Sequence, residues 1–468
     1  MTFDVVIRNG TIVTAGDVFT ADIGITGERI STIGQGLSGR QVIDATGLLV
    51  MPGGIDGHCH IEQEEADGTV HEDDFASASA SALLGGTTSA VCFASHVPGR
   101  GMVEQFEAYR RRGGRSRVDF AIHQIVTRTD ADTIEQDIPE IARQGAAGLK
   151  VFMTYDDFHL TDGQFLRVLD AAKAGGLIVS VHCENYDAIR HMIDAHLAAG
   201  RTDAHAHATS RPPGLEREAT YRAMALGELV DHPIQIFHVS CPEVAEEIAR
   251  ARHRGVKVSA ETCPHYLALT ENDLKRDGFE GSKYICSPPL RTQADQDGMW
   301  KYLREGVIGI VSSDHCGYTF EGSHGKARHG RDADFSLIPN GMPGLGTRMP
   351  VLFHAGVNSG RISLTDFVRL TATAPARRYG LYPRKGTIAP GSDADLVLWD
   401  PARQVRITND LFQGNIDYTP YEGLHVTGWP VMVMARGAVA VQHGQLLRAP
   451  TAGRFLRPEH PTAHPADD

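Results

Sequence analysis

The chain has 468 residues, more than one simple core usually holds, so two domains are expected. Its formal net charge of -13 disfavours binding to nucleic acid or to an anionic membrane surface. No apolar run approaches the length of a membrane span. These properties favour a globular protein whose partner is a small neutral molecule.

The cysteines indicate a reducing compartment. There are seven, an odd number, and most lie scattered in apolar stretches, as buried free thiols do. None are spaced as Cys-x-x-Cys, so a cysteine-based zinc site is not expected. The N-terminus lacks a basic segment followed by a long apolar one, which argues against a signal peptide. We therefore expect a cytoplasmic protein.

Both ends of the chain are rich in short β-branched runs separated by turns. This texture fills residues 1–50 and returns at 394–399 and 431–437. Two such ends around a different middle predict one small β-sandwich domain built from both termini. We expect it to comprise residues 1–50 and 385–450, followed by a C-terminal tail at 451–468.

The middle of the chain, residues 51–384, repeats a strand followed by a helix. Helical patterns occur at 73–84, 164–174, 217–230 and 244–254. The eight strand candidates are 48–56, 87–93, 119–126, 148–153, 177–183, 234–240, 256–263 and 309–316. This alternation predicts an α/β fold, a (β/α)8 TIM barrel, with its functional site at the carboxyl ends of the strands. An open doubly wound sheet is the competing fold, but it would not bring side chains from so many strands to one point.

Two segments outside these elements are expected to be irregular. Residues 317–347 are rich in Gly, Arg, Asp and Pro, which predicts a long loop over the mouth of the barrel. Within it, the turn residues at 338–344 could hold backbone groups against a ligand. From Pro458 onward the chain is expected to form a loose tail.

A cluster of metal-competent residues follows the strand candidates. Residues 53–60 read Gly-Gly-Ile-Asp-Gly-His-Cys-His, and His58 and His60 share one face of a strand because they are two residues apart. Four more such residues stand at or near the ends of later strands: Lys150, His182, His238 and Asp314. Imidazole and carboxylate are ordinary zinc ligands, so the set predicts a pair of divalent cations.

Lys150 is the unusual member of this set, because an ammonium group cannot bind a cation. Inside a barrel and beside two metals, desolvation and like charge favour the neutral amine. A neutral amine can add carbon dioxide to form a carbamate, whose two oxygens can bridge two metals. The alternative is a lysine that only caps the end of its strand.

Seven motifs occur in a fixed order along nearly the whole chain, about residues 4–440. They lie at 56–60, 148–155, 181–185, 238–240, 286–291, 313–315 and 384–395. Any one is a weak signal, but the ordered set resembles the cyclic amidohydrolases, most closely the dihydropyrimidinases and D-hydantoinases.

The resemblance implies hydrolysis of the cyclic amide bond of 5,6-dihydropyrimidines or hydantoins to N-carbamoyl amino acids, by a metal-bridging hydroxide. It implies two divalent metal ions, with zinc expected, and a homotetramer. One metal would be bound by His58, His60 and Asp314, the other by His182 and His238, with N6-carboxylated Lys150 as the bridge.

The resemblance also implies roles for residues that contact the substrate. Asp314 would act as base and then as acid, and Tyr155 would donate a hydrogen bond to the oxyanion. Backbone groups at Ser287 and Asn340 would bind the N–H and C=O of the ring. The alternative interpretations are that Tyr155 packs at a strand end and that Ser287 and Asn340 are turn residues. His315 is expected to have a structural role or to support a ligand.

Three departures concern the pocket and its loops. Residues 62–67 are acidic, and His159 stands where an apolar residue might be expected, so we expect a preference for small or polar ring substituents over aryl ones. Gly346 replaces an acidic residue expected in many relatives.

No arginine follows His60 closely, which argues against an anionic ring of the dihydroorotase type.

Two rival functions remain open from the sequence. An allantoinase or a cyclic-imide hydrolase would use the same binuclear site. A non-catalytic structural homologue is disfavoured, because such relatives lose metal ligands and all six candidates are present here.

Overall fold

The computed structural model describes residues 2–447, 452–459 and 462. Nine parallel strands form one sheet in the middle of the chain, and every residue in them is buried, as expected for strands covered by helices. They are β8 (Gly54–His60), β9 (Thr87–Ala94), β10 (Asp119–Ile125), β11 (Gly148–Phe152), β12 (Ile178–His182), β13 (Ile234–Ile236), β14 (Val258–Thr262), β15 (Ile310–Val311) and β16 (His315–Cys316).

One segment closes this sheet into a barrel. β15 pairs with β14 at one edge, and β16 pairs with β8 at the other, with His315 opposite Cys59. Both strands belong to the strand expected at 309–316, which is interrupted at Ser312, Ser313 and Asp314. The expected (β/α)8 barrel is therefore confirmed, with its eighth strand broken at a proposed site residue.

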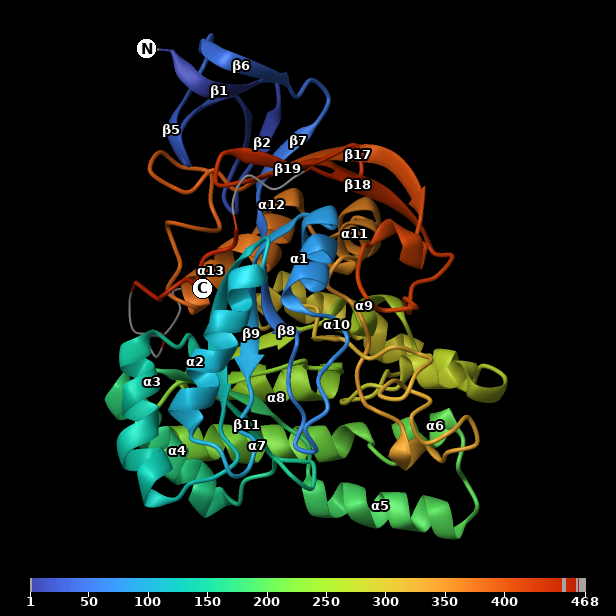
Figure 1. Ribbon diagram of the computed structural model, residues 1–468. Helices are drawn as coiled ribbons and strands as arrows, with labels where there is room; N and C mark the ends of the chain where they lie inside the picture. The colour runs from blue at the N-terminus through green and yellow to red at the C-terminus, as the bar shows by residue number, and fades with distance from the viewer. Residues whose placement is uncertain (1, 448–451, 460–461, 463–468) are drawn as a thin grey trace.

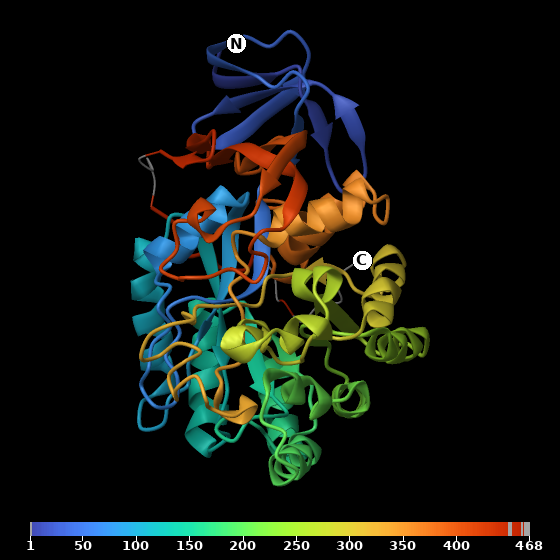
Figure 2. The same cartoon turned by 90° about the vertical axis from the view of Figure 1, so that its right-hand side faces the viewer.

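Helices surround the barrel on its outer side (Figures 1 and 2). The longer ones are α1 (Phe75–Leu84), α2 (Met102–Arg112), α3 (Ile138–Gln144), α4 (Asp162–Gly175), α5 (Tyr186–Ala198), α7 (Pro213–Leu229), α8 (Pro242–His253) and α10 (Gln293–Arg304). The sequence sets their ends: α4 begins with a capping box between Thr161 and Gln164 and ends at the left-handed Gly176. The four helices expected from periodicity are α1, α4, α7 and α8.

Shorter helical segments connect the barrel elements and lead to the C-terminal strands. The α-helical ones are α6 (Ala204–Thr209), α9 (Pro264–Ala268), α11 (Arg348–Leu352), α12 (Leu364–Val368) and α13 (Ala374–Arg378). Single 3-10 or π turns are η1 (Gly113–Arg115), η2 (Thr133–Asp137), η3 (Glu271–Lys275), η4 (Gly278–Tyr284), η5 (Phe335–Leu337), η6 (Phe353–Asn358), η7 (Arg369–Thr373) and η8 (Asn409–Leu411). Only η5 falls within the loop expected at 317–347.

The second domain consists of two sheets built from both ends of the chain, as expected (Figure 1). One contains β1 (Phe3–Arg8), β4 (Asp22–Thr26), β5 (Arg29–Gly34) and β6 (Gly39–Asp44). The other contains β2 (Thr11–Val13), β3 (Val18–Thr20), β7 (Leu49–Pro52), β17 (Leu396–Arg406), β18 (His425–Ala435), β19 (Ala438–Gln442) and β20 (Gln445–Leu446). Side chains such as Ile7, Ile25 and Met434 fill the core between them.

The strand expected at 48–56 is divided between the two domains. β7 pairs with β17 and β2 in the sandwich, and β8 begins the barrel at Gly54. Gly53 lies at the change of sheet, where a Cβ atom would come within 2.1 Å of the Thr88 hydroxyl oxygen. The apolar run is continuous, so the sequence alone does not reveal this division.

A buried ion cluster links the barrel to the C-terminal strands. The Lys385 ammonium lies 2.6 Å from Asp119 of β10, 2.6 Å from Asp395 and 3.0 Å from Asp393. Burial disfavours the charged amine, but the carboxylates of Asp395 and Asp119 raise the pKa of Lys385 above its ordinary value. Asp119 also pairs with Arg436 of the sandwich. Lys385 is thus the cation that the three carboxylates share, while Arg436 and Arg384 each pair with one of them.

The described part of the C-terminal tail packs against the amino ends of the barrel strands. The Phe120 amide donates to the Arg454 carbonyl at 2.9 Å, and the Leu456 amide donates to the Phe120 carbonyl at 2.7 Å. The Thr462 side chain is buried and accepts a bond from the Ile178 amide at 3.0 Å. Thr462 is therefore not loose, although it falls in the segment expected to be so. Most of the rest of that segment lies outside the described residues.

Gly346 lies in a tightly packed position. A Cβ atom there would come within 2.4 Å of the Phe412 ring and 2.6 Å of the Ser81 hydroxyl oxygen. An acidic side chain at this position would displace Phe412. Glycine therefore fits this position, where a larger residue would have to move Phe412 or Ser81.

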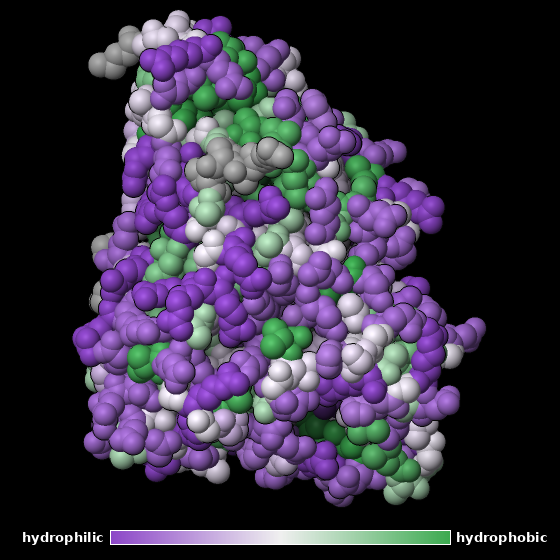
Figure 3. Space-filling model, in the orientation of Figure 1, coloured by the Kyte–Doolittle hydropathy of each residue, from purple (hydrophilic) through white to green (hydrophobic). Residues whose placement is uncertain are grey.

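No helix among the described residues is both long and apolar enough to cross a membrane. The face of the molecule drawn in Figure 3 carries mainly hydrophilic residues, and a recess is visible on it above α5.

We predict that Lys385→Met lowers the free energy of unfolding by about 3–5 kcal/mol, because three buried carboxylates lose their shared cation. Denaturation in urea measures the change. Lys301→Met, which removes an exposed lysine on α10, is the control and should change stability by less than about 0.5 kcal/mol. Equal stability of the two variants would contradict the role given to the cluster.

Candidate functional site

Side chains from most of the barrel strands meet in one cavity of about 350 Å³, within the range for small ligands. Every residue proposed from the sequence as a site residue lines it: His58, His60, Lys150, Tyr155, His182, His238, Ser287, Asp314 and Asn340. The sequence-based prediction of one shared site therefore matches where these side chains lie.

Three of these residues converge on a single point. Asp314 Oδ1 lies 3.2 Å from His58 Nε2 and 3.3 Å from His60 Nε2. The two imidazole Nε2 atoms are 3.2 Å apart. Two imidazole nitrogens and a carboxylate oxygen facing one point suit a divalent cation.

Each of three histidine rings is held by one nitrogen, so that its other nitrogen can face the cavity. His58 Nδ1 lies 2.5 Å from Glu261, and His60 Nδ1 lies 2.6 Å from the Gln63 side-chain oxygen. His182 Nε2 lies 2.7 Å from Glu184. Such partners fix the tautomer and orientation of a metal-binding histidine.

Burial also favours the neutral form of two of the histidines in the cavity. It lowers the pKa of His58 and His238 well below the ordinary value, helped by the positive charge of Lys150 for His58 and by His182 for His238. The His182 and His238 ring centroids are 4.4 Å apart. These two histidines therefore form a second pair of neutral donors beside the first cluster.

The sequence analysis gave no role to Glu261, Gln63 or Glu184. A glutamate in the middle of the buried strand β14 is a signal that could have identified Glu261, because charged residues are almost never fully buried without a partner. Glu184 adjoins His182 in a quoted motif, but its contact with that ring depends on side-chain geometry.

The Lys150 amine is buried without a hydrogen-bond partner among the described residues. It lies 4.1 Å from the Phe237 ring centroid and 4.9 Å from that of Phe152. Burial lowers the pKa of Lys150 to about 8, although the carboxylates of Asp314 and Glu261 act in the opposite direction. The environment thus weakens the ammonium form, so that a neutral amine with a free lone pair is reached at a lower pH than for an exposed lysine.

Three site residues have a left-handed backbone, with φ of 74° at Tyr155, 39° at His238 and 48° at Asp314. Bulky residues rarely adopt this conformation, and such strain is concentrated at functional sites. At Asp314 it coincides with the break in the eighth strand, where the amide donates to the His58 carbonyl at 2.9 Å. The backbone thus turns Asp314 toward the histidines.

Two acidic side chains of the segment 62–67 are held by contacts with other side chains of the protein. Glu64 pairs with Arg100 at 2.9 Å, away from the cavity. Glu65 lines the cavity and accepts bonds from His71 at 2.6 Å and from Tyr318 at 2.8 Å. Burial would raise the pKa of Glu65, but these hydrogen bonds lower it to about 2, so the carboxylate is ionised.

His159 does not line the cavity, contrary to its expected influence on the pocket. Its ring stacks on Tyr186 with centroids 4.0 Å apart, and the neighbouring Phe158 faces the cavity instead. The direction of a side chain in this irregular segment cannot be read from residue order. Asp156 and Asp157 also line the cavity, so this part of the wall combines an apolar ring with two carboxyl groups.

Comparisons with known proteins agree with this geometry. The model of the amidohydrolase family matches residues 49–440. The chain belongs to the amidohydrolase family. It is 44% identical to a D-hydantoinase from Ralstonia pickettii over 457 residues, covering 97% of this chain and 98% of the relative. It is 41% identical to a D-hydantoinase from Geobacillus stearothermophilus, covering 96% of each.

A solved structure has the same fold. The dihydropyrimidinase from Brevibacillus agri NCHU1002 superposes with a TM-score of 0.93 at 40% identity, covering 97% of this chain and 98% of that one. Family membership and the histidine cluster together indicate a metal-dependent site.

We predict that Glu261→Gln weakens metal binding roughly 10- to 100-fold, because the His58 ring loses the carboxyl group that holds its Nδ1 atom. Competition with a chelator measures the affinity. Glu243→Gln removes an exposed carboxylate that pairs with Arg217 and should leave the affinity unchanged. Equal affinities of the two variants would show that Glu261 does not support the metal site.

Proposed function

We propose that this protein hydrolyses the cyclic amide bond of 5,6-dihydropyrimidines or hydantoins, which yields N-carbamoyl amino acids. The observation that carries this proposal is the convergence in one cavity of the nine residues named from the sequence, eight of which lie in the ordered motifs. Its relatives are named D-hydantoinase and dihydropyrimidinase, at 44% and 40% identity over nearly the whole chain.

The donor set fits two divalent cations, for which zinc is the expected metal. His58, His60 and Asp314 would hold one, and His182 and His238 the other. The unpartnered Lys150 amine supports N6-carboxylation, which would turn it into a bridging anion. When bound, the cations supply a water molecule of lowered pKa and polarise the carbonyl that is attacked.

The remaining residues handle protons and orient the ring. Asp314 would accept a proton from the attacking water and deliver it to the departing ring nitrogen. Burial raises the pKa of Tyr155, so its hydroxyl keeps the proton that it would donate to the developing oxyanion. Backbone groups at Ser287 and Asn340 would bind the ring's N–H and C=O, since both residues line the cavity.

We predict that hydantoin and dihydrouracil are opened to N-carbamoyl products, and that a chelator removes this activity until zinc and bicarbonate are restored. Product release from a panel of rings, with metal content per chain, provides the measurement. If allantoin or a cyclic imide were opened faster, that compound would replace hydantoin and dihydrouracil as the proposed substrate. A chain that binds no metal and opens no ring would support a non-catalytic homologue.

We predict that small or polar ring substituents are preferred over aryl ones, because the ionised Glu65 and the polar Gln63 line the cavity. Glu65→Leu should raise kcat/KM for phenylhydantoin relative to dihydrouracil by roughly tenfold. Glu64→Leu, next to it but turned toward Arg100, is the matched control. A wild-type protein that opens phenylhydantoin far faster than dihydrouracil would contradict this preference.

The homotetramer and the cytoplasmic location expected from the sequence stay predictions. They rest on family resemblance and on cysteine usage rather than on the cavity.

A further inference from the structure

Lys326 lies in the loop at 317–347 and is buried, with 1% of its surface exposed. Its amine donates to the Ile285 carbonyl at 2.8 Å and to the Pro339 carbonyl at 2.6 Å. These two carbonyls belong to segments more than fifty residues apart in the chain. Lys326 therefore joins two separate parts of the cavity wall.

No carboxylate lies within ion-pair distance of Lys326 in the part of the chain that the structure describes. Its titratable neighbours are His207 and the thiols of Cys286 and Cys316. Burial raises the pKa of both thiols and lowers that of His207, so all three are neutral. A buried amine without a counter-ion is costly and is retained only where its hydrogen bonds matter.

The two segments that Lys326 joins carry the proposed ring contacts. Ser287 is two residues after Ile285, and Asn340 directly follows Pro339. Ser287, Pro339 and Asn340 line the cavity, whereas Lys326 does not. Lys326 thus lies behind the wall that the substrate would touch.

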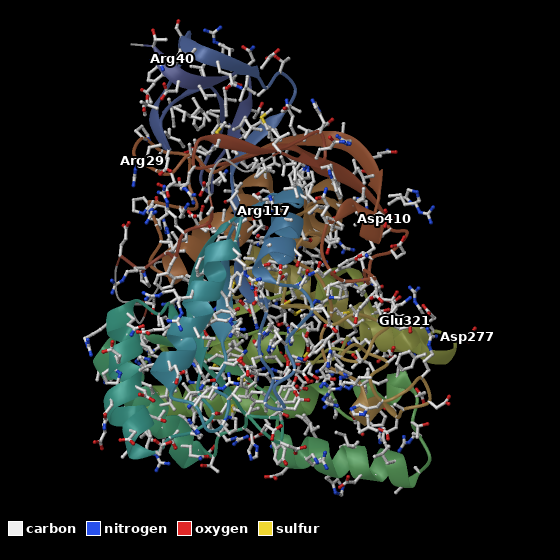
Figure 4. The ribbon with its side chains drawn as sticks, viewed as in Figure 1. Arg29, Arg40, Arg117, Asp277, Glu321 and Asp410 are labelled. Atoms are coloured by element: carbon white, nitrogen blue, oxygen red, sulfur yellow. The ribbon has the colours of Figure 1, made fainter. Side chains whose placement is uncertain are left out.

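The same loop has a second, outer contact with the segment that leads to Ile285. The Phe320 and Phe279 ring centroids are 5.5 Å apart. Figure 4 labels Glu321 and Asp277, which are close to these two rings in the sequence, and both lie at the edge of the molecule in that view. Because the outer ends of the two segments are already packed, Lys326 acts at their inner ends, beside the cavity.

We propose that Lys326 is a positioning residue for substrate binding, whose amine fixes the separation of the backbone at 285–287 from that at 339–341. This inference rests on the proposed function, because it assigns the ring to those two segments. Lys326 itself touches no reacting atom.

Removal of the amine has an unequal effect on its two acceptors. The Ile285 carbonyl keeps a bond from the Gly341 amide at 3.0 Å. The Pro339 carbonyl loses its donor, so that Asn340 is then held to the segment at 285 only through the bond of the next residue, Gly341. Backbone contacts to the ring act in both the ground state and the transition state, so their loss raises KM more than it lowers kcat.

Lys326→Met tests the proposal. We expect KM for dihydrouracil or hydantoin to rise roughly tenfold, since the wall beside Asn340 loses a buried hydrogen bond, while kcat changes by less than about threefold. Metal content should stay that of the wild type. Lys173→Met is the matched control, because the exposed Lys173 also donates to a backbone carbonyl, that of Val230 at 2.8 Å, but far from the cavity wall.

Lys326→Gln is the second variant if the methionine variant does not fold, because it keeps an N–H donor on a shorter side chain. Its KM is expected to lie between those of the wild type and Lys326→Met. A KM within about twofold of the wild type, or a fall in kcat at unchanged KM, would overturn the proposal. Failure of the wild type to open any ring would instead overturn the proposed function, so the two failures are distinguishable.

Discussion

The site depends on one buried amine. Lys150 lies inside the barrel among aromatic rings, 4.1 Å from the centroid of Phe237, with no hydrogen-bond partner among the described residues. A charged lysine in such surroundings is costly, and the carboxylation proposed for Lys150 would remove that cost by making it an anion between two cations. The neutral histidines around it and the carboxylate of Asp314 are what such an arrangement needs. The lysine thus explains why the donors surround it.

Closure of the barrel and assembly of the site use the same segment. The eighth strand pairs with β14 through Val311 and with β8 through His315, and between these pairs it breaks to turn Asp314 toward His58 and His60. The left-handed backbone at Asp314 is costly on its own. The sheet on both sides keeps it in place, so the stability of the barrel offsets strain at the site. The segment that closes the barrel therefore also orients Asp314 in the site.

The sequence predicted the barrel, the two-ended sandwich and the shared cavity, because strand periodicity and ordered motifs are local signals. It missed features set by side-chain direction or by distant contacts. The run at 48–56 is uniformly apolar, so its division between two sheets was not visible. His159 turned out to face Tyr186, and the partners of Lys326 lie in segments far along the chain. The domain boundaries at residues 50, 384 and 450 stay predictions.

The most direct test is X-ray diffraction at the zinc absorption edge, from crystals grown with zinc and bicarbonate. We expect two anomalous peaks in the cavity, one beside His58, His60 and Asp314 and one beside His182 and His238. We also expect carboxylate density on the Lys150 amine, between the two peaks. An unmodified Lys150 side chain against the Phe237 ring, with no metal between the histidines, would contradict the proposed binuclear site.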